Sequence, residues 1–176
     1  LELGGKSPNI VFADCPDMDA AAAAAAGNVF YNQGESCNAP TRLYVQASIK
    51  DEFMKKVAAH VAGFKPGDPL DPETTMGAIV DDTQLNSVMK YIESGKTEGA
   101  ELLAGGNRSR EESGGYFIEP TIFVTDKNHT IAREEIFGPV LSAMSFETEE
   151  EVIALANDSI YGLQAGLWTA DISRAH

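Results

Sequence analysis

The hydrophobic positions of this chain follow two periods, one typical of strands and one typical of helices. Short apolar runs bounded by turn residues predict strands at 8–13, 41–46, 100–106, 116–124, 138–146 and 162–169. Apolar residues that return every three or four positions predict helices from Asp17 or Asp19 toward Tyr31, from Ser48 to about Gly63, over 81–95 and from Thr148. Strands and helices therefore alternate, which predicts an α/β fold with a mostly parallel sheet flanked by helices.

Proline and glycine mark the connections between these elements. Residues 65–77 carry three prolines and two glycines, and 107–115 are polar, so both read as loops. Pro120 interrupts the strand at 116–124, so we expect that strand to lie at a sheet edge or to carry a bulge. Periodic elements resume after each loop, and the length of 176 residues suits one domain, so we expect residues 1–176 to form a single domain.

The formal net charge of −14 changes which partners are plausible. Phosphate backbones and anionic membrane surfaces need clustered Lys and Arg, so the chain is not expected to bind nucleic acid or membranes. No run of about 18 apolar residues predicts a membrane span. The two cysteines do not form a disulfide framework, and a cysteine that must stay reduced fits the cytoplasm.

Three segments hold residues suited to covalent catalysis. Glu2 opens LELGGKSPNIVF, Cys37 lies in FYNQGESCNAPTRLYV, and Glu135 lies in EEIFGPVL. Cys37 follows small and polar residues and precedes a predicted strand, which suits an exposed thiol held by a rigid element. One thiol with two carboxylates indicates an enzyme that forms an acyl intermediate on cysteine.

At these segments the sequence resembles the aldehyde dehydrogenase superfamily. ELGGKSPNIV resembles its general-base segment, FYNQGESCNAPTR its nucleophile segment and EEIFGPV a segment that contacts the cofactor, in the order and spacing of that family. Within the family, NIVFADCPDMD, FKPGDPLDPETTMG, LANDSIYGL and WTADISRAH resemble the bacterial γ-glutamyl-γ-aminobutyraldehyde dehydrogenases. The resemblance covers essentially the whole chain and implies the α/β catalytic domain of that family.

The resemblance implies a role for each candidate residue. Cys37 would be the nucleophile, and Glu2 the base for the thiol or for the water that hydrolyses the thioester. The residues that would contact the nicotinamide end of NAD or NADP are Leu3, Gly4, Glu135 and Phe137. The backbone N–H of Cys37 would supply one oxyanion donor. Cys15, between Asp14 and Pro16, is expected to be structural, and Asn32 to order its loop.

Part of the expected machinery is missing from this sequence. No glycine-rich turn between a strand and a helix is followed by an acidic residue about 20 positions later, so the dinucleotide-binding domain is expected to lie outside this chain. Cofactor would then be bound mainly by that domain. The cysteines and histidines show no zinc spacing, so no metal site is expected.

The function expected for the parent protein is oxidation of a small aldehyde, of an aminoaldehyde type, to a carboxylate. A full-length parent of this family would be a homo-oligomer. Two alternatives remain open at this stage. The chain could be a catalytically inert isolated domain, or it could be a cofactor-free cysteine esterase or thioesterase, which would need a histidine near Cys37.

Overall fold

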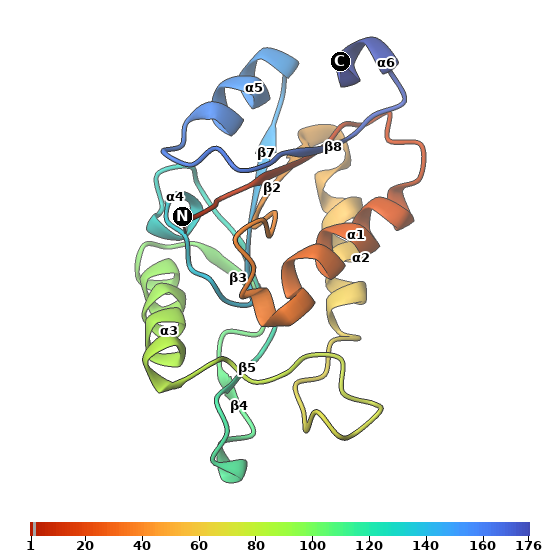
Figure 1. Ribbon diagram of the computed structural model, residues 1–176. Helices are drawn as coiled ribbons and strands as arrows, with labels where there is room; N and C mark the ends of the chain where they lie inside the picture. Colours follow the sequence, from red (N-terminus) through yellow and green to blue (C-terminus); the bar gives the residue numbers. More distant parts are fainter. Residues whose placement is uncertain (2) are drawn as a thin grey trace.

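The computed structural model describes Leu1 and residues 3–176 (Figure 1). The strands are β1 (Pro8–Val11), β2 (Arg42–Gln46), β3 (Glu101–Ala104), β4 (Arg108–Ser109), β5 (Phe117–Ile118), β6 (Thr121–Val124), β7 (Val140–Phe146) and β8 (Gly166–Trp168). The α-helices are α1 (Met18–Phe30), α2 (Lys50–Val61), α3 (Asp82–Thr97), α4 (Thr130–Arg133), α5 (Glu149–Asn157) and α6 (Ile172–Ala175). Short 3-10 turns occupy Tyr31–Gly34, Ala47–Ile49 and Glu111–Ser113.

The central sheet has six strands in the order β3-β6-β7-β2-β1-β8. The four ladders from β6 to β8 are parallel, and only β3 runs antiparallel to its neighbour β6. The predicted α/β fold with a mostly parallel sheet is therefore confirmed. β4 and β5 form a separate antiparallel pair that projects from one end of the sheet (Figure 1).

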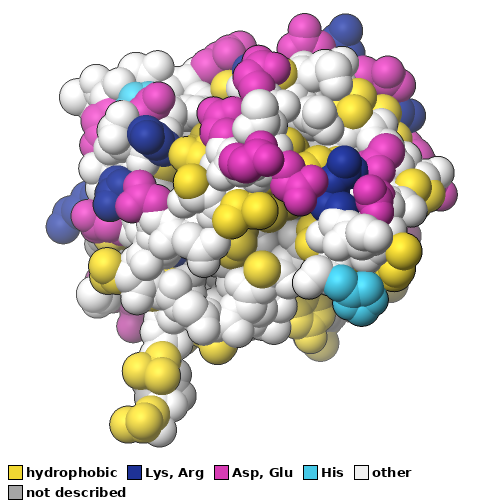
Figure 2. All heavy atoms as spheres, turned by 90° about the horizontal axis from the view of Figure 1, so that it is seen from above, with side chains coloured by type: hydrophobic (Ala, Val, Ile, Leu, Met, Phe, Trp, Pro, Cys, Tyr) yellow, Lys and Arg dark blue, Asp and Glu magenta, His cyan; other side chains and the backbone are white. Residues whose placement is uncertain are grey.

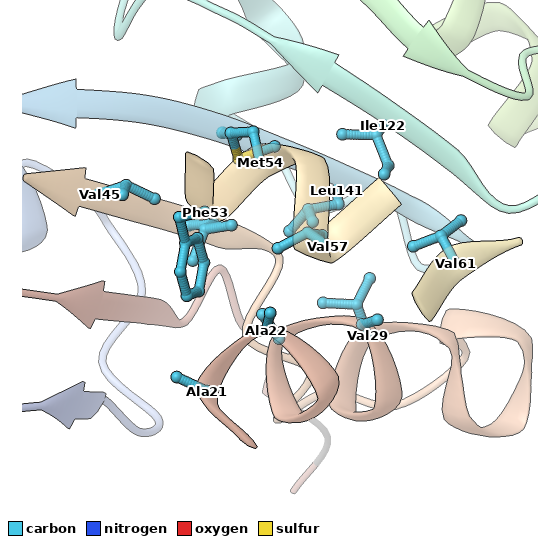
Figure 3. Close-up of a cluster of buried hydrophobic side chains, with 14 of the residues drawn as sticks. Ala21, Ala22, Val29, Val45, Phe53, Met54, Val57, Val61, Ile122 and Leu141 are labelled. Atoms are coloured by element: carbon cyan, nitrogen blue, oxygen red, sulfur yellow. The ribbon is translucent and has the colours of Figure 1, made fainter. Parts of the chain in front are cut away.

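Helices cover both faces of the sheet. On one face α1 and α2 pack on side chains of β2 and β7 such as Leu43, Val45 and Leu141 (Figure 3). On the other face, α3, α4 and α5 cover neighbouring side chains of the same strands, including Tyr44 and Val140. Successive strand residues therefore face opposite cores, which explains why these strands read as nearly continuous apolar runs.

The alanine-rich sequence of α1 serves its packing against α2. Ala21, Ala22, Ala25 and Ala26 are buried, and their small side chains let Phe53 and Val57 of α2 approach closely (Figure 3). Burying a Phe or Val side chain stabilises the fold by about 1.5–3 kcal/mol. The first turns of α1 and α5 are capped as expected, because Asp17 accepts a hydrogen bond from Ala20 N at 2.9 Å and Thr148 accepts one from Glu151 N at 3.2 Å.

Some local predictions were wrong. Ser48 does not cap α2, because the chain enters that helix through a 3-10 turn and Ile49 occupies the cap position. The segment 116–124 is two strands, and β6 is internal, not at an edge. Pro120 lies between β5 and β6, outside both ladders, so its missing N–H costs no strand pairing. The bulge falls in β3, between Leu102 and Ala104.

Other elements were missed or shortened. The predicted loop 107–115 contains β4, which pairs with β5. The four-residue helix α4 is too short to show a period in the sequence. The strand predicted at 162–169 is reduced to β8, and residues 162–165 form a loop instead. That loop borders the candidate site.

Candidate functional site

Cys37 lies on an exposed turn between α1 and β2. The turn is closed by the Ala39 N–H, which donates to the Ser36 carbonyl at 3.0 Å, and by the Ser36 hydroxyl, which bonds to Asn38 Oδ1 at 2.7 Å. β2 begins immediately after the turn and is buried. The thiol is therefore accessible to a small molecule, while the backbone that carries it is fixed by hydrogen bonds on one side and by the sheet on the other.

The three residues that precede this turn have a left-handed backbone. Asn32, Gln33 and Gly34 have φ values of 50°, 48° and 75°. A non-glycine residue with positive φ is uncommon, and asparagine tolerates it best. Asn32 Nδ2 donates to the Glu35 carbonyl at 2.8 Å, which closes the bend from inside. The placement agrees with the expectation that Asn32 orders its loop, and the NQG sequence explains how α1 can end so abruptly.

Gly4 and Gly5 lie directly against Glu135. The Gly5 N–H donates a hydrogen bond of 2.9 Å to Glu135 Oε1. A Cβ placed on Gly4 would lie 2.4 Å from Glu135 Oε2 and 2.9 Å from Tyr161 Cε1. A side chain at residue 4 would therefore push the Glu135 carboxylate and the Tyr161 ring out of the positions that they occupy here.

Gly5 and Gly34 bring the segment around Cys37 into contact with the other motifs. A Cβ on Gly5 would fall 1.9 Å from the Cys37 carbonyl oxygen, and a Cβ on Gly34 would fall 2.2 Å from the Gly138 carbonyl oxygen. Both neighbours are backbone atoms and cannot rotate away. The three motifs, separated by as many as 130 residues in sequence, thus meet at Gly5 through one hydrogen bond to the Glu135 carboxylate and one close contact with the Cys37 backbone.

Phe137 has a backbone that its side chain does not favour. Its φ is 54° and its side chain is 38% exposed, whereas the neighbouring Ile136 is buried in the core. Gln84 of α3 holds this conformation by donating from Nε2 to the Phe137 carbonyl at 2.7 Å and to the Ile136 carbonyl at 3.1 Å. A bulky residue with positive φ is a strained conformation that clusters at functional sites. An exposed aromatic ring held in this way is suited to packing against a planar ligand.

An apolar hollow of about 330 Å³ lies beside Gly4. It is lined by Leu3, Gly4 and the segment Ile160–Leu163. Leu3 is 68% exposed, so its side chain is available to a ligand. Gln164, the next residue along, donates from Nε2 to the Asn38 carbonyl and so ties this wall to the nucleophile turn.

Sequence reasoning missed the contribution of the 160–164 segment. Residues 162–164 fall within a predicted strand, and Tyr161 and Leu163 carry no charge or reactive group that would mark them as site residues. The glycine at 162 next to a polar residue at 164 was the available sign of a loop.

Two further acidic residues belong to the motifs, Glu2 and Glu134. Glu2 lies outside the described residues, so its predicted role stays a prediction. Glu134 does not share the position of its neighbour Glu135: it is exposed and accepts a hydrogen bond of 2.8 Å from the Tyr91 hydroxyl. Partial burial and that hydrogen bond raise the pKa of Tyr91 to about 12.

The histidines are committed elsewhere. His60 Nε2 lies 3.6 Å from Asp19 Oδ1 beside α2, and His129 Nδ1 lies 2.7 Å from Thr125 Oγ1. His176 ends the chain beyond α6. Across Leu1 and residues 3–176, no group of three or more His, Cys, Asp or Glu side chains could hold a metal ion. A hydrolase built on a Cys–His pair therefore finds little support here.

Cys15 differs from Cys37 in its surroundings. It is only partly accessible and packs against the core beneath α1 and α2, and burial raises the pKa of its thiol. A raised pKa leaves less of the reactive thiolate at neutral pH. Of the two thiols, Cys37 is the more accessible.

The surface around the C-terminal helices is strongly acidic (Figure 2). The first turn of α5 carries Glu149, Glu150 and Glu151. Arg174 of α6 lies among carboxylates, 2.8 Å from Asp14 Oδ2 and 2.9 Å from Glu149 Oε2.

No helix among the described residues has both the length and the apolar character needed to cross a membrane.

The chain is similar to known proteins over its whole length. The sequence pattern of the aldehyde dehydrogenase family matches residues 1–176. The chain is 51% identical to the NADP/NAD-dependent aldehyde dehydrogenase PuuC of Escherichia coli, over all of this chain and 35% of that protein. It superposes with a TM-score of 0.98 on γ-glutamyl-γ-aminobutyraldehyde dehydrogenase from Burkholderia cenocepacia, at 52% identity, covering 36% of that chain.

A third comparison includes a bound cofactor. The chain is similar, with a TM-score of 0.98 and 55% identity, to an indole-3-acetaldehyde dehydrogenase in complex with NAD⁺, of which it covers 36%. In each case all of this chain is matched. The chain therefore spans about a third of the length of these relatives.

Proposed function

Because the chain belongs to the aldehyde dehydrogenase family, we propose that the full-length protein containing it oxidises an aldehyde to a carboxylate with NAD or NADP. This chain would supply the nucleophile, the base and the part of the cofactor site that faces the nicotinamide. The single observation that carries the proposal is the convergence of the three motifs at Gly5, whose N–H meets Glu135 while its α-carbon abuts the Cys37 carbonyl.

Cys37 is the proposed nucleophile. Its sulfur adds to the aldehyde carbon to form a thiohemiacetal, whose oxyanion then expels hydride and leaves a thioester on the sulfur. The exposed turn gives the substrate access, and the backbone N–H of Cys37 is a donor that can stabilise the oxyanion. Hydrolysis of the thioester by water releases the carboxylate and returns the thiol.

Glu2 is the proposed base for that water and for the thiol. Its assignment rests on its place in the motif, directly before Leu3 and Gly4, which line the apolar hollow. Proton transfer by a positioned carboxylate contributes about 10²–10⁴-fold to rate. The loss of this group would therefore be felt in turnover more than in cofactor binding.

The residues present fit the nicotinamide end of the cofactor. The Glu135 carboxylate can accept hydrogen bonds from ribose hydroxyls, and the exposed Phe137 ring can pack beside a planar ring. Gly4 leaves the room that a Cβ would fill, and Leu3 offers apolar contact. The bound cofactor supplies the acceptor for the hydride. The rest of the dinucleotide would be held by the part of the protein that lies outside this chain.

The proposed substrate is a small aliphatic aldehyde bearing an amino or amide group. The Burkholderia cenocepacia protein supports this class, because its name makes γ-glutamyl-γ-aminobutyraldehyde its substrate. We expect the full-length protein to form a homo-oligomer in the cytoplasm, where the thiol stays reduced.

Kinetics of the full-length protein test this proposal. Aminoaldehyde-dependent NADH or NADPH formation should be lost in Cys37→Ser and kept in the matched variant Cys15→Ser, because Cys15 lies away from the site. Glu2→Gln should slow turnover by about 10²–10⁴-fold with little change in cofactor affinity. Ester hydrolysis that needs no cofactor, without aldehyde oxidation, would favour the esterase alternative, and normal oxidation in Cys37→Ser would refute the proposal.

A further inference from the structure

A second cavity lies on the other side of the Tyr161–Leu163 wall. It has a volume of about 260 Å³ and is bounded by the residues that lead into β1, by the C-terminal end of α5 and by residues 161–165. Tyr161, Gly162 and Leu163 line both this cavity and the apolar hollow beside Leu3. Whatever occupies the second cavity therefore touches the wall of the candidate active site.

The second cavity is lined by two buried cationic side chains. Lys6 is 1% exposed and Arg42 is 3% exposed. Buried Lys and Arg side chains are rare in proteins unless a carboxylate or another anion neutralises them. Among the described residues, however, no carboxylate forms an ion pair with either one. The cavity is thus electropositive in a chain whose net charge is −14.

Arg42 already uses its donors on neutral acceptors. Nε donates to the Lys6 carbonyl at 2.7 Å, and Nη2 donates to the Ala156 carbonyl at 2.9 Å. Nη1 is shared between the Tyr44 hydroxyl at 3.1 Å and the Leu155 carbonyl at 3.2 Å. These bonds fix the guanidinium in place, but within residues 3–176 they bring no negative charge to it.

The side chains of Lys6 and Ser7 differ from that of Arg42 in their hydrogen bonding. Lys6 Nζ and Ser7 Oγ are the buried side-chain polar atoms that find no hydrogen-bond partner in the part of the chain that is described. A lysine ammonium carries three donors, and leaving a buried donor unmade costs about 1–3 kcal/mol or more. Both residues line the same cavity, so an acceptor bound there would lie beside both of them.

Electrostatics point the same way. Burial and the neighbouring Arg42 lower the pKa of Lys6 to about 7, against the weaker opposing effect of Glu135 and Glu134. Neither of these glutamates is within hydrogen-bond or ion-pair distance of the Lys6 amine. A water molecule would satisfy a donor but would bring no charge, whereas an anion would satisfy the donors and stabilise the ammonium.

We propose that this cavity is a binding site for one carboxylate or similarly small oxyanion, held by the Lys6 ammonium and the Ser7 hydroxyl. The anion braces the Tyr161–Leu163 wall from the side opposite the apolar hollow. The same chemistry has two possible sources, a free carboxylate from solution or a carboxylate side chain from the part of the protein outside this chain. The site stands on its own contacts and does not depend on the proposed oxidation.

Two measurements on the full-length protein test the site. One is a calorimetric titration with formate. The other is a crystal structure from crystals grown without carboxylate, sulfate or phosphate buffers. For a free anion, wild-type protein binds formate, and Lys6→Met weakens binding roughly 10–100-fold, the loss expected for a charged hydrogen bond. Ser7→Ala, which keeps the cationic charge and is easier to accommodate, weakens it about 2–10-fold. The exposed Lys55 gives the matched control Lys55→Met, which should bind formate as wild type does.

For an anion supplied by the protein, formate does not bind, and the crystal structure shows an Asp or Glu carboxylate from outside this chain within hydrogen-bond distance of Lys6 Nζ. Two results overturn the proposal. One is formate affinity that neither Lys6→Met nor Ser7→Ala changes. The other is absence of formate binding together with only waters, carbonyl groups or Glu135 around Lys6 Nζ.

Discussion

Gly5 donates its backbone N–H to Glu135 Oε1 at 2.9 Å, across 130 positions of sequence. The same residue leaves no room for a side chain on its other side, where an added Cβ would fall 1.9 Å from the Cys37 carbonyl oxygen. One glycine therefore sets both the orientation of the carboxylate and the depth of the nucleophile turn. The proposed catalytic and cofactor residues are thus coupled through the backbone of Gly5, by its hydrogen bond to the Glu135 carboxylate and by its close approach to the Cys37 carbonyl.

Replacement of Gly5 by alanine is expected to damage the site. The new methyl group would overlap a backbone carbonyl, so the nucleophile turn or the 3–5 segment must shift, and overpacking of this kind costs about 1–3 kcal/mol. We expect a lower midpoint in urea unfolding and a loss of thiol reactivity or turnover beyond the loss of stability. Gly27→Ala is the matched control. A Cβ there meets no atom within 4 Å, and alanine should stabilise helix α1 by roughly 0.5–1 kcal/mol. Unchanged stability and reactivity in Gly5→Ala would contradict the close contact.

The two cysteines should react at different rates. Cys37 is exposed on its turn, whereas partial burial raises the pKa of Cys15 and lowers its thiolate fraction at neutral pH. With limiting iodoacetamide, peptide mass spectrometry should find carbamidomethylation mainly on Cys37. The Cys37→Ser variant should then be labelled only slowly. Equal labelling of both residues, or labelling mainly of Cys15, would remove the support for Cys37 as nucleophile.

The sequence predicted the parts of this molecule that depend on local pattern. The strands β1, β2 and β7 are largely buried and rich in apolar residues, and α3 has a clear helical period, so these elements were found. The helix α4 and strand β4 were missed because they are four and two residues long, and tertiary contacts, not propensity, hold them. The internal place of β6 was also hidden, because a proline between strands looks in sequence like a proline within one.

The candidate site, too, was predicted only where it depends on local sequence. Motif residues such as Cys37 and Glu135 could be named from their segments, but their meeting at Gly5 depends on the strand order. Lys6 carried no signal in the sequence, where a lysine beside two glycines looks like an exposed one. Its burial follows from the packing of α5 and residues 161–165 over the residues that precede β1.

Burial of Lys6 should make the stability of this chain depend on pH. Its pKa is about 7 in the folded chain and 10.5 when unperturbed. Below pH 7 both states carry the proton, and the folded state bears the full cost of a buried ammonium. Between pH 7 and 10.5 only the unfolded state keeps the proton, so this residue's contribution to stability rises with pH.

The variant Lys6→Met isolates that contribution. In urea unfolding without added carboxylates, Lys6→Met should exceed wild type in stability by a few kcal/mol at pH 7, because each unit of pKa shift corresponds to about 1.36 kcal/mol. The difference should shrink as the pH approaches 10, while the exposed Lys55→Met variant should track wild type throughout. A difference that stays constant from pH 7 to 10 would show that Lys6 has no lowered pKa.

The 176-residue chain alone is expected to form no NADH from NAD and an aliphatic aldehyde. Hydride transfer needs the reacting atoms held within about 3–3.5 Å, and the chain offers Glu135 and Phe137 only for the nicotinamide end. Its sequence has no glycine-rich turn leading into a helix for the pyrophosphate, and the family resemblance implies that a second oxyanion donor, an asparagine side chain, lies outside it. Loss of one such donor costs about 2.7–4 kcal/mol in known enzymes. NADH formation is measured by its absorbance. The full-length protein is the positive control, and alkylation of Cys37 checks that the chain is folded. Sustained NADH formation that disappears in Cys37→Ser would mean that this chain holds a complete cofactor site.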